Sequence, residues 1–123
     1  SAASDVYKRQ EYEINRVEAY DNSHTFGKNS VGVMVVADKE GLSPKHYRKF
    51  NIRYDMKDKK ISSVDDYYMM EEVLSRRLGK INQNDESTIP DVIIVDGGRG
   101  QYNSVLKIIK KYQLENIKLL SVS

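Results

Sequence analysis

The sequence has 123 residues and a mass of 14.2 kDa, which is the size of one domain, or part of one, with a single hydrophobic core. It has no cysteine, which excludes disulfides, thiolate zinc sites and cysteine nucleophiles, and no apolar run approaches the ~18 residues of a membrane span, so no membrane partner is expected. A net charge of +2 excludes nucleic-acid binding by overall charge alone, so such binding needs a local basic patch.

The first residues do not resemble the start of a domain. Ser1–Gln10 lacks the apolar stretch of a signal peptide and resembles a translated sequencing adaptor. We therefore interpret residues 1–13 as an extension of artefactual origin and residues 14–123 as the domain. Because the chain stops inside an apolar, strand-like run, we also expect this domain to be incomplete at its C-terminus.

Three strands are predicted in the first half of the domain, at Arg16–Tyr20, Val31–Ala37 and Tyr47–Tyr54. In the first strand Val17 and Ala19 alternate inward, and the turn residues Asp21–Ser23 end it. A hairpin turn is expected at Asp38–Gly41. Because short turns join these strands, they should form an antiparallel meander.

The second half alternates helices with strands. Helices are predicted at Val64–Leu78 and Gln101–Tyr112, and strands at Val92–Val95 and Ile117–Leu120. Ser63 can cap the first helix, and Asp66 stands three residues later, as in a capping box. The apolar stripes of the two helices are Met70, Val73, Leu74 and Leu78, and Val105, Leu106, Ile108 and Ile109.

The continuous apolar run Val92–Val95 is typical of a strand buried on both faces, which belongs in the middle of a sheet beside the first strand. Strand–helix–strand units need right-handed parallel crossovers. The sequence therefore predicts an α/β fold with a mixed five-stranded sheet, three antiparallel strands followed by βαβ units, flanked by helices. This is the element order of the ribonuclease H-like fold.

Two carboxylates follow neighbouring strands of this sheet. Asp21 follows the first strand and Asp96 the buried fourth one, so both should emerge at the carboxyl edge, where α/β sheets bind ligands. Carboxylate oxygens suit Mg²⁺ or Mn²⁺, which accept phosphate oxygens as further ligands. Each Asp alone is more typical of a turn residue. The pair favours a divalent metal site.

Other residues have two interpretations each. The turn Gly97–Gly100 can hold a phosphate at a helix N-terminus, or simply reverse the chain. Asp66 lies at the edge of the helix stripe that faces the sheet, but its spacing from Ser63 favours a role in helix capping. His24 is either a ligand or phosphate contact, or a turn residue. Most basic residues form solvated faces, but Arg48, Arg76 and Arg77 neighbour the motifs and are the better phosphate contacts.

Four blocks in order resemble the C-terminal endonuclease domain of UvrC, the excinuclease of bacterial nucleotide excision repair. They are VEAYDNSHTFG (Val17–Gly27), YRKFNI (Tyr47–Ile52), DDYYMMEEVLSRR (Asp65–Arg77) and PDVIIVDGGRGQ (Pro90–Gln101). The resemblance spans nearly the whole chain, and the second and third blocks favour UvrC over other ribonuclease H-like nucleases such as endonuclease V. It implies a ribonuclease H-like fold and metal-dependent hydrolysis of damaged double-stranded DNA on the 5′ side of a lesion.

The resemblance also implies roles for single residues. Asp21 and Asp96 match the family's catalytic metal ligands for Mg²⁺ or Mn²⁺, and Asp66 matches a carboxylate implicated in the 5′ incision. Apart from the resemblance, Arg48, Arg76, Arg77, Arg99 and His24 are the residues that we expect to contact DNA. The family's third catalytic residue is a His beyond the second metal ligand, and no His follows Asp96 in this sequence.

The family's remaining parts lie outside this sequence. They are the GIY-YIG nuclease domain, the segment that binds UvrB and the helix-hairpin-helix domain. We therefore expect a bacterial cytoplasmic protein in which this chain alone cuts DNA poorly. Two alternatives stay open: a non-catalytic nucleic-acid-binding module that uses Arg48, Arg77 and Lys80, and a small phosphate-binding domain that uses the Gly97–Gly100 turn.

Overall fold

The structure is a computed structural model that describes residues 13–24, 29–53, 65–81 and 88–123. Its elements are β1 (Arg16–His24), β2 (Asn29–Asp38), β3 (Gly41–Leu42), the 3₁₀ helix η1 (Pro44–His46), β4 (Arg48–Arg53), α2 (Asp65–Leu78), β5 (Val92–Asp96), α3 (Arg99–Lys111) and β6 (Lys118–Val122). The adaptor-like Ser1–Gln10 and the predicted cap Ser63 lie outside the described residues. No helix within the described ranges is long and apolar enough to cross a membrane.

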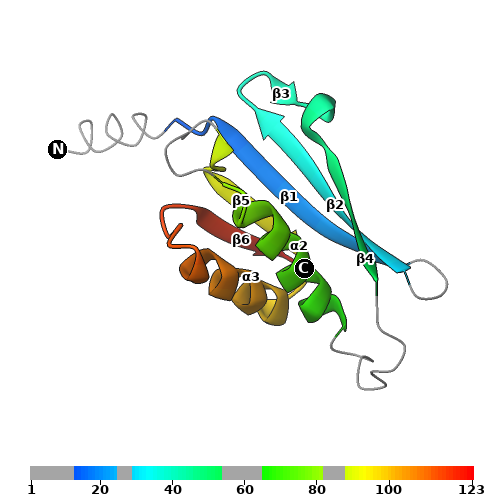
Figure 1. Ribbon diagram of the computed structural model, residues 1–123. Helices are drawn as coiled ribbons and strands as arrows, with labels where there is room; N and C mark the ends of the chain where they lie inside the picture. Colours follow the sequence, from blue (N-terminus) through cyan, green and yellow to red (C-terminus); the bar gives the residue numbers. More distant parts are fainter. Residues whose placement is uncertain (1–12, 25–28, 54–64, 82–87) are drawn as a thin grey trace.

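The strands form one mixed sheet in the order β3-β2-β1-β5-β6, with β4 also paired to β2 (Figure 1). The pairs of β2 with β1, β3 and β4 are antiparallel, and β5 is parallel to both β1 and β6. This confirms the predicted mixed α/β sheet, the meander and the position of β5 beside β1. The parallel strand pairs are the ones that the predicted strand–helix–strand connections require.

The sheet has six strands instead of the predicted five, because β3 is an additional two-residue strand. Asp38 Oδ1 accepts a hydrogen bond from the Glu40 N–H at 2.9 Å, and Gly41 has a φ of +114°, so the chain reverses tightly there. It then pairs with β2 until η1, which starts at Pro44, interrupts the edge and β4 resumes it. A strand of two residues is too short to show any periodicity in the sequence.

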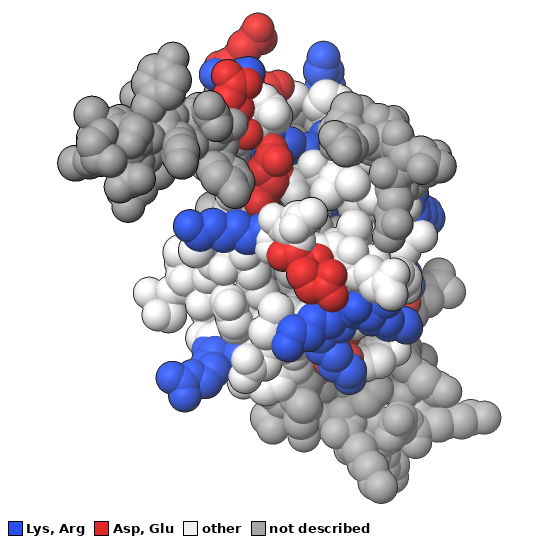
Figure 2. Space-filling model, turned by 90° about the vertical axis from the view of Figure 1, so that its left-hand side faces the viewer, with Lys and Arg blue, Asp and Glu red and all other residues white. Residues whose placement is uncertain are grey.

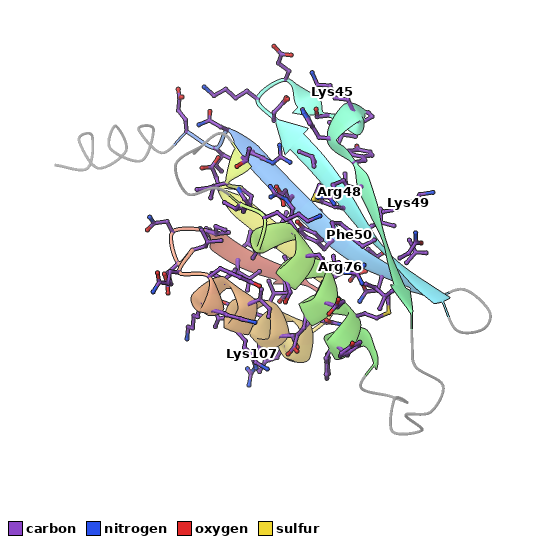
Figure 3. All side chains as sticks on the ribbon, viewed as in Figure 1. Lys45, Arg48, Lys49, Phe50, Arg76 and Lys107 are labelled. Carbon is purple, nitrogen blue, oxygen red and sulfur yellow. The ribbon has the colours of Figure 1, made fainter. Side chains whose placement is uncertain are left out.

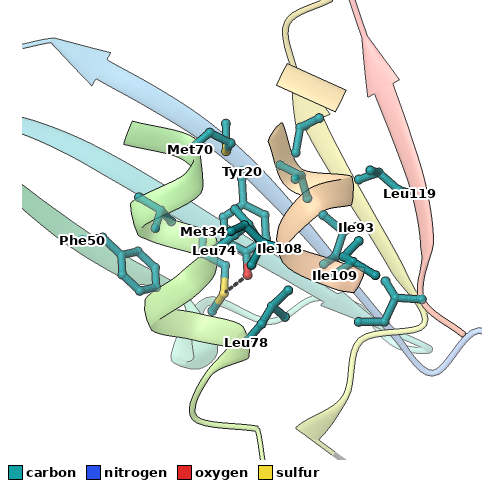
Figure 4. Close-up of a cluster of buried hydrophobic side chains, with 14 of the residues drawn as sticks. Tyr20, Met34, Phe50, Met70, Leu74, Leu78, Ile93, Ile108, Ile109 and Leu119 are labelled. Atoms are coloured by element: carbon teal, nitrogen blue, oxygen red, sulfur yellow. Dashed lines mark hydrogen bonds between the residues drawn. The ribbon is translucent and has the colours of Figure 1, made fainter. Parts of the chain in front are cut away.

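Both helices pack side by side on the same face of the sheet, and the core lies between them and the strands (Figures 1 and 4). All four residues of the predicted α2 stripe are buried, and so are Val105, Ile108 and Ile109 of α3, whereas Leu106 is half-buried. The prediction that β5 is buried on both faces holds only in part. Ile93 is fully buried beneath the helices, but Ile94 on the opposite face is half-buried.

The inward face of β1 is the reverse of the predicted one. Glu18 and Tyr20 point toward the helices and are 0% and 2% exposed, whereas Val17 and Ala19 lie on the opposite face and are half-buried. A carboxylate can occupy this place because its hydrogen bonds are satisfied there. Glu18 Oε2 accepts bonds from Arg77 Nη2 and Arg16 Nε, each at 2.7 Å, and Oε1 accepts one from the Tyr20 hydroxyl at 2.5 Å.

This cluster of Glu18, Tyr20, Arg16 and Arg77 joins β1 to the end of α2. Burial raises the pKa of Tyr20 well above its usual range, and the neighbouring Glu18 carboxylate raises that pKa further. The hydroxyl therefore keeps its proton and donates to Glu18. Arg77 Nη2 also donates to the Thr88 carbonyl at 2.6 Å, so the same guanidinium anchors the chain that enters β5.

Candidate active site

The register of the sheet brings Asp21 and Asp96 together. β1 and β5 are parallel, and Ala19 pairs with Ile94 and Tyr20 with Val95. The next residue on each strand is an aspartate, so the two lie side by side on strands about 4.8 Å apart. Contrary to the prediction, neither is a turn residue after its strand: β1 continues to His24, and Asp96 is the last residue of β5.

β1 extends beyond Asp21 because β2 pairs with it along its full length. Asp21 lies opposite Val33, and Asn22 opposite Gly32. The cluster Asp21–Ser23 has the composition of a turn, but the backbone ladder to β2 holds it extended. Tertiary pairing therefore overrides the local preference of these residues.

Both carboxylates lie on the face of the sheet that α2 and α3 leave open. Tyr20 and Val95 point toward the helices, and side chains alternate along a strand, so Asp21 and Asp96 point the other way. Both are exposed. Asp21 Oδ1 accepts the N–H of Asn22 at 2.8 Å. Two adjoining, exposed carboxylates fit Mg²⁺ or Mn²⁺, which take hard oxygen ligands and keep several waters.

Two other predicted residues are placed only through their backbones. His24 ends β1, three residues beyond Asp21, and Asp66 is the second residue of α2. Their side chains lie outside what the structure describes. Within the described parts of the chain, no group of three His, Cys, Asp or Glu residues is arranged to hold a metal ion. The described part of the site is thus a carboxylate pair.

The predicted DNA-contacting arginines have different surroundings. Arg99 is exposed as the first residue of α3, three residues after Asp96. Arg76 is exposed, but it donates to the Asn51 carbonyl at 2.8 Å and to Glu72 at 3.1 Å, so it also joins α2 to β4. On the face drawn in Figure 2, the acidic and basic side chains of the described residues are interleaved and form no large patch of one sign among themselves.

The other two predicted arginines lie on the helix-covered face of the sheet. Arg48 is exposed, with its guanidinium carbon 4.7 Å from the centroid of the Phe50 ring (Figure 3). Arg77 is only 7% exposed and pairs with Glu18, so its guanidinium also has a structural role inside the domain. Sequence reasoning missed Glu18; the signal was a carboxylate between the apolar residues Val17 and Ala19 of a predicted strand.

A glycine turn joins β5 to α3 directly after Asp96. Gly97 has a φ of +133°, and its N–H donates to the Val122 carbonyl at 2.9 Å. Gly98 is the N-cap of α3, with no side-chain capping bond and open space around it. The first turn of α3 has no acidic residue, so no carboxylate within that turn offsets the positive end of the helix dipole.

We expect Gly97→Ala to lower the free energy of unfolding by about 1–2 kcal/mol, because an L-residue is strained at this φ. An added Cβ also lies 2.3 Å from Gln101 Cγ. Gly98→Ser is the matched control: Gly98 has extended backbone and nothing within 4 Å, and Ser is a better N-cap, so this variant should be at least as stable as wild type. Urea unfolding measures both, and equal stability of the two variants contradicts the prediction.

The comparisons with known proteins agree on one family. Residues 8–123 match the model of the UvrC RNase H endonuclease domain. The chain is similar to the UvrABC system protein C of Bradyrhizobium diazoefficiens, with 42% identity over 88% of this chain and 17% of that protein. It is equally similar to that of Rhodopseudomonas palustris, with 43% identity over 88% of this chain and 17% of that protein.

Solved structures support the fold. The catalytic domain of human endonuclease V aligns with a TM-score of 0.57 and 12% identity, over 90% of this chain and 56% of that chain. At this identity the likeness concerns the fold alone, and it confirms the predicted ribonuclease H-like architecture. The chain spans about 17% of the length of the curated relatives it matches.

Proposed function

This chain belongs to the UvrC RNase H endonuclease domain family, and from that premise we propose that it is the part of a nucleotide excision repair endonuclease that makes the 5′ incision in damaged DNA. The substrate we propose is damaged double-stranded DNA, and the protein partner is UvrB, bound through regions outside this chain. We place the protein in the bacterial cytoplasm. The chain alone should cut poorly, because those regions also hold DNA.

One observation carries the proposal: the parallel register of β1 and β5 sets Asp21 beside Asp96 at the carboxyl edge of the sheet. Substrates of open α/β sheets bind at this edge. Both side chains are exposed on a face that no helix covers within the described residues, so a phosphodiester has access to them. Two carboxylates here would repel a DNA phosphate unless a cation lies between them, which supports a divalent metal.

Each predicted site residue has its own role in this proposal. Asp21 and Asp96 would hold Mg²⁺ or Mn²⁺, and a bound ion would supply stabilisation of the charge on the reacting phosphate oxygens. Arg99, exposed at the start of α3, attracts the DNA backbone next to this pair, and Arg76 contacts a phosphate farther along. We propose that Asp66 and His24 complete the catalytic and DNA-contacting groups. Arg48 remains a proposed phosphate contact on the other face of the sheet.

We expect the wild-type chain to bind Mg²⁺ with a dissociation constant of about 1 mM, because few protein carboxylates and several waters hold such an ion. Asp21→Asn and Asp96→Asn should each abolish detectable binding. Isothermal titration calorimetry measures this, or competition with Mn²⁺ followed by its electron paramagnetic resonance signal. The exposed Glu115→Gln, which removes the same charge away from the site, should bind like wild type.

Wild-type affinity in both aspartate variants would contradict the metal assignment. DNA binding that survives in Asp21→Asn, together with unchanged 5′ incision by the full-length protein, would favour the non-catalytic module instead. A salt-dependent affinity for DNA alone does not separate the two, because either function requires phosphate contacts.

A further inference from the structure

A second charged site lies on the other face of the sheet from Asp21 and Asp96. It is a hollow of about 510 Å³ between η1, the start of β4 and the end of α2. Four cationic side chains line it: Arg16, Lys45, Arg48 and Arg77. His46 and Tyr47 complete that part of its wall. Its volume lies in the range of small-ligand sites, about 300–1,000 Å³.

Among the residues that the structure describes, the positive charge of this hollow is not balanced by carboxylates. Arg16 and Arg77 share one carboxylate, Glu18, whose oxygens already accept three hydrogen bonds. No second carboxylate pairs with either guanidinium in the part of the chain that the structure describes. Arg77 is nearly buried, and the side chain of Arg16 is only 19% exposed. An unpaired charge with so little water around it is costly, which favours a bound anion.

The remaining donors point to the same ligand chemistry. With described residues as partners, Arg16 donates to Glu18 through Nε, and Arg77 donates to Glu18 and Thr88 through Nη2. The other guanidinium N–H groups have no partner among those residues and are available to a ligand. The guanidinium carbon of Arg48 lies 4.7 Å from the centroid of the Phe50 ring, so a cation–π contact holds this side chain in place (Figure 3). Lys45 adds a point charge from η1. Guanidinium forks of this kind match phosphate oxygens.

The polarity of the surroundings limits where an anion can lie. A neighbouring hollow shares Arg16 and His46 with this one, but Asp38 and Asp91 line it. Asp91 is already engaged, since its Oδ2 accepts the backbone N–H groups of Asn15 and Arg16. An anion is therefore attracted to the side of the hollow that faces η1, β4 and α2, away from Asp38 and Asp91.

We propose that this hollow binds a phosphate group, at a site separate from the carboxylate pair. The phosphate belongs either to a free phosphate or phosphorylated small molecule, or to the backbone of a nucleic acid. In both cases Arg16 and Arg77 form the floor of the site, and Lys45 and Arg48 close it from the solvent side. The site does not depend on the metal-binding role of Asp21 and Asp96.

The test uses the full chain, with inorganic phosphate and pyrophosphate as probes. Thermal unfolding is followed by circular dichroism at constant ionic strength, with chloride replaced by the probe. The probe should raise the unfolding temperature of wild type, and Lys45→Gln/Arg48→Gln should weaken the apparent affinity about tenfold or more. Both residues are exposed, so unfolding of the double variant in chloride should match wild type.

Two controls isolate the site. Lys110→Gln/Lys118→Gln removes two positive charges from exposed positions outside the hollow and should keep the wild-type response. Asp21→Asn should keep it as well, which separates a failure here from a failure of the metal site. Equal responses of wild type and Lys45→Gln/Arg48→Gln, or no response of wild type to either probe, would overturn the proposal.

A short DNA duplex distinguishes the two sources of phosphate. If the backbone of DNA supplies it, Lys45→Gln/Arg48→Gln weakens duplex binding and pyrophosphate competes with the duplex. If a free phosphate or a phosphorylated small molecule supplies it, the probes bind but duplex affinity is the same in wild type and variant. Either result supports the site and assigns its ligand.

Discussion

Asp21→Asn and Asp96→Asn are each expected to lower the rate of 5′ incision by the full-length protein about 100-fold or more. A metal-binding carboxylate supports several kcal/mol of charge stabilisation in the transition state, and each 1.4 kcal/mol corresponds to a tenfold rate change. The measurement is single-turnover incision of a duplex with one defined lesion. Because Asn keeps the size of Asp and both side chains are exposed, the domain should stay folded.

The incision experiment needs a control for charge and one for DNA binding. Glu115→Gln changes an exposed carboxylate away from the site and should cut at the wild-type rate. The aspartate variants should bind the lesion duplex in the absence of metal at least as tightly as wild type, because they remove negative charge near the phosphates. Incision within a few fold of wild type in both variants would rule out the carboxylate pair as the catalytic site.

Glu18→Ala is expected to lower the free energy of unfolding by about 3–5 kcal/mol, because it leaves the buried Arg77 without its partner. That is a large part of the about 5–15 kcal/mol that stabilises a typical domain. It also removes the acceptor of the Tyr20 hydroxyl. Chemical unfolding followed by circular dichroism gives the difference directly.

Glu18→Gln keeps the shape of the side chain and one acceptor oxygen, so it stays measurable if Glu18→Ala does not fold. Glu13→Gln is its matched control. Glu13 pairs with Lys39 at 2.7 Å, the same distance as Glu18 to Arg77, but its side chain is 63% exposed. Solvent screens such a pair, so this change should lower the free energy of unfolding far less than Glu18→Gln does. Equal losses in the two Gln variants would show that burial does not strengthen the Glu18 cluster.

Much of the fold was predictable from local pattern. The α2 stripe at Met70, Val73, Leu74 and Leu78 is confirmed because helical spacing directly reports which face is buried. The apolar run of β5 indicated a central strand, and its parallel neighbours follow from the strand–helix–strand order. The short strand β3 was not predictable, because it exists only through its pairing with β2.

The interpretation of β1 shows where sequence reasoning fails. Val17 and Ala19 are the apolar alternation, yet Glu18 and Tyr20 face the core. Alternation defines the two faces of a strand, but it does not say which face the helices cover. A face with a carboxylate can be the covered one when a residue far away in the sequence pairs with that carboxylate. Arg77 satisfies Glu18 from 59 residues away, a pairing that no local pattern contains. The same contact gives Arg77, a predicted phosphate contact, a structural partner that the sequence did not indicate.

The main helices and strands, the family blocks and the pairing of Asp21 with Asp96 were predictable from the sequence, because periodicity and motif spacing are properties of the chain. Only the tertiary structure decided that this pair lies on the open face of the sheet, because the register of β1 and β5 and the packing of the helices set which side chains are covered. It also decided which charges are buried and which line a hollow. These depend on packing between segments far apart in the chain, and the cost of an unpaired buried charge exists only once that packing excludes water.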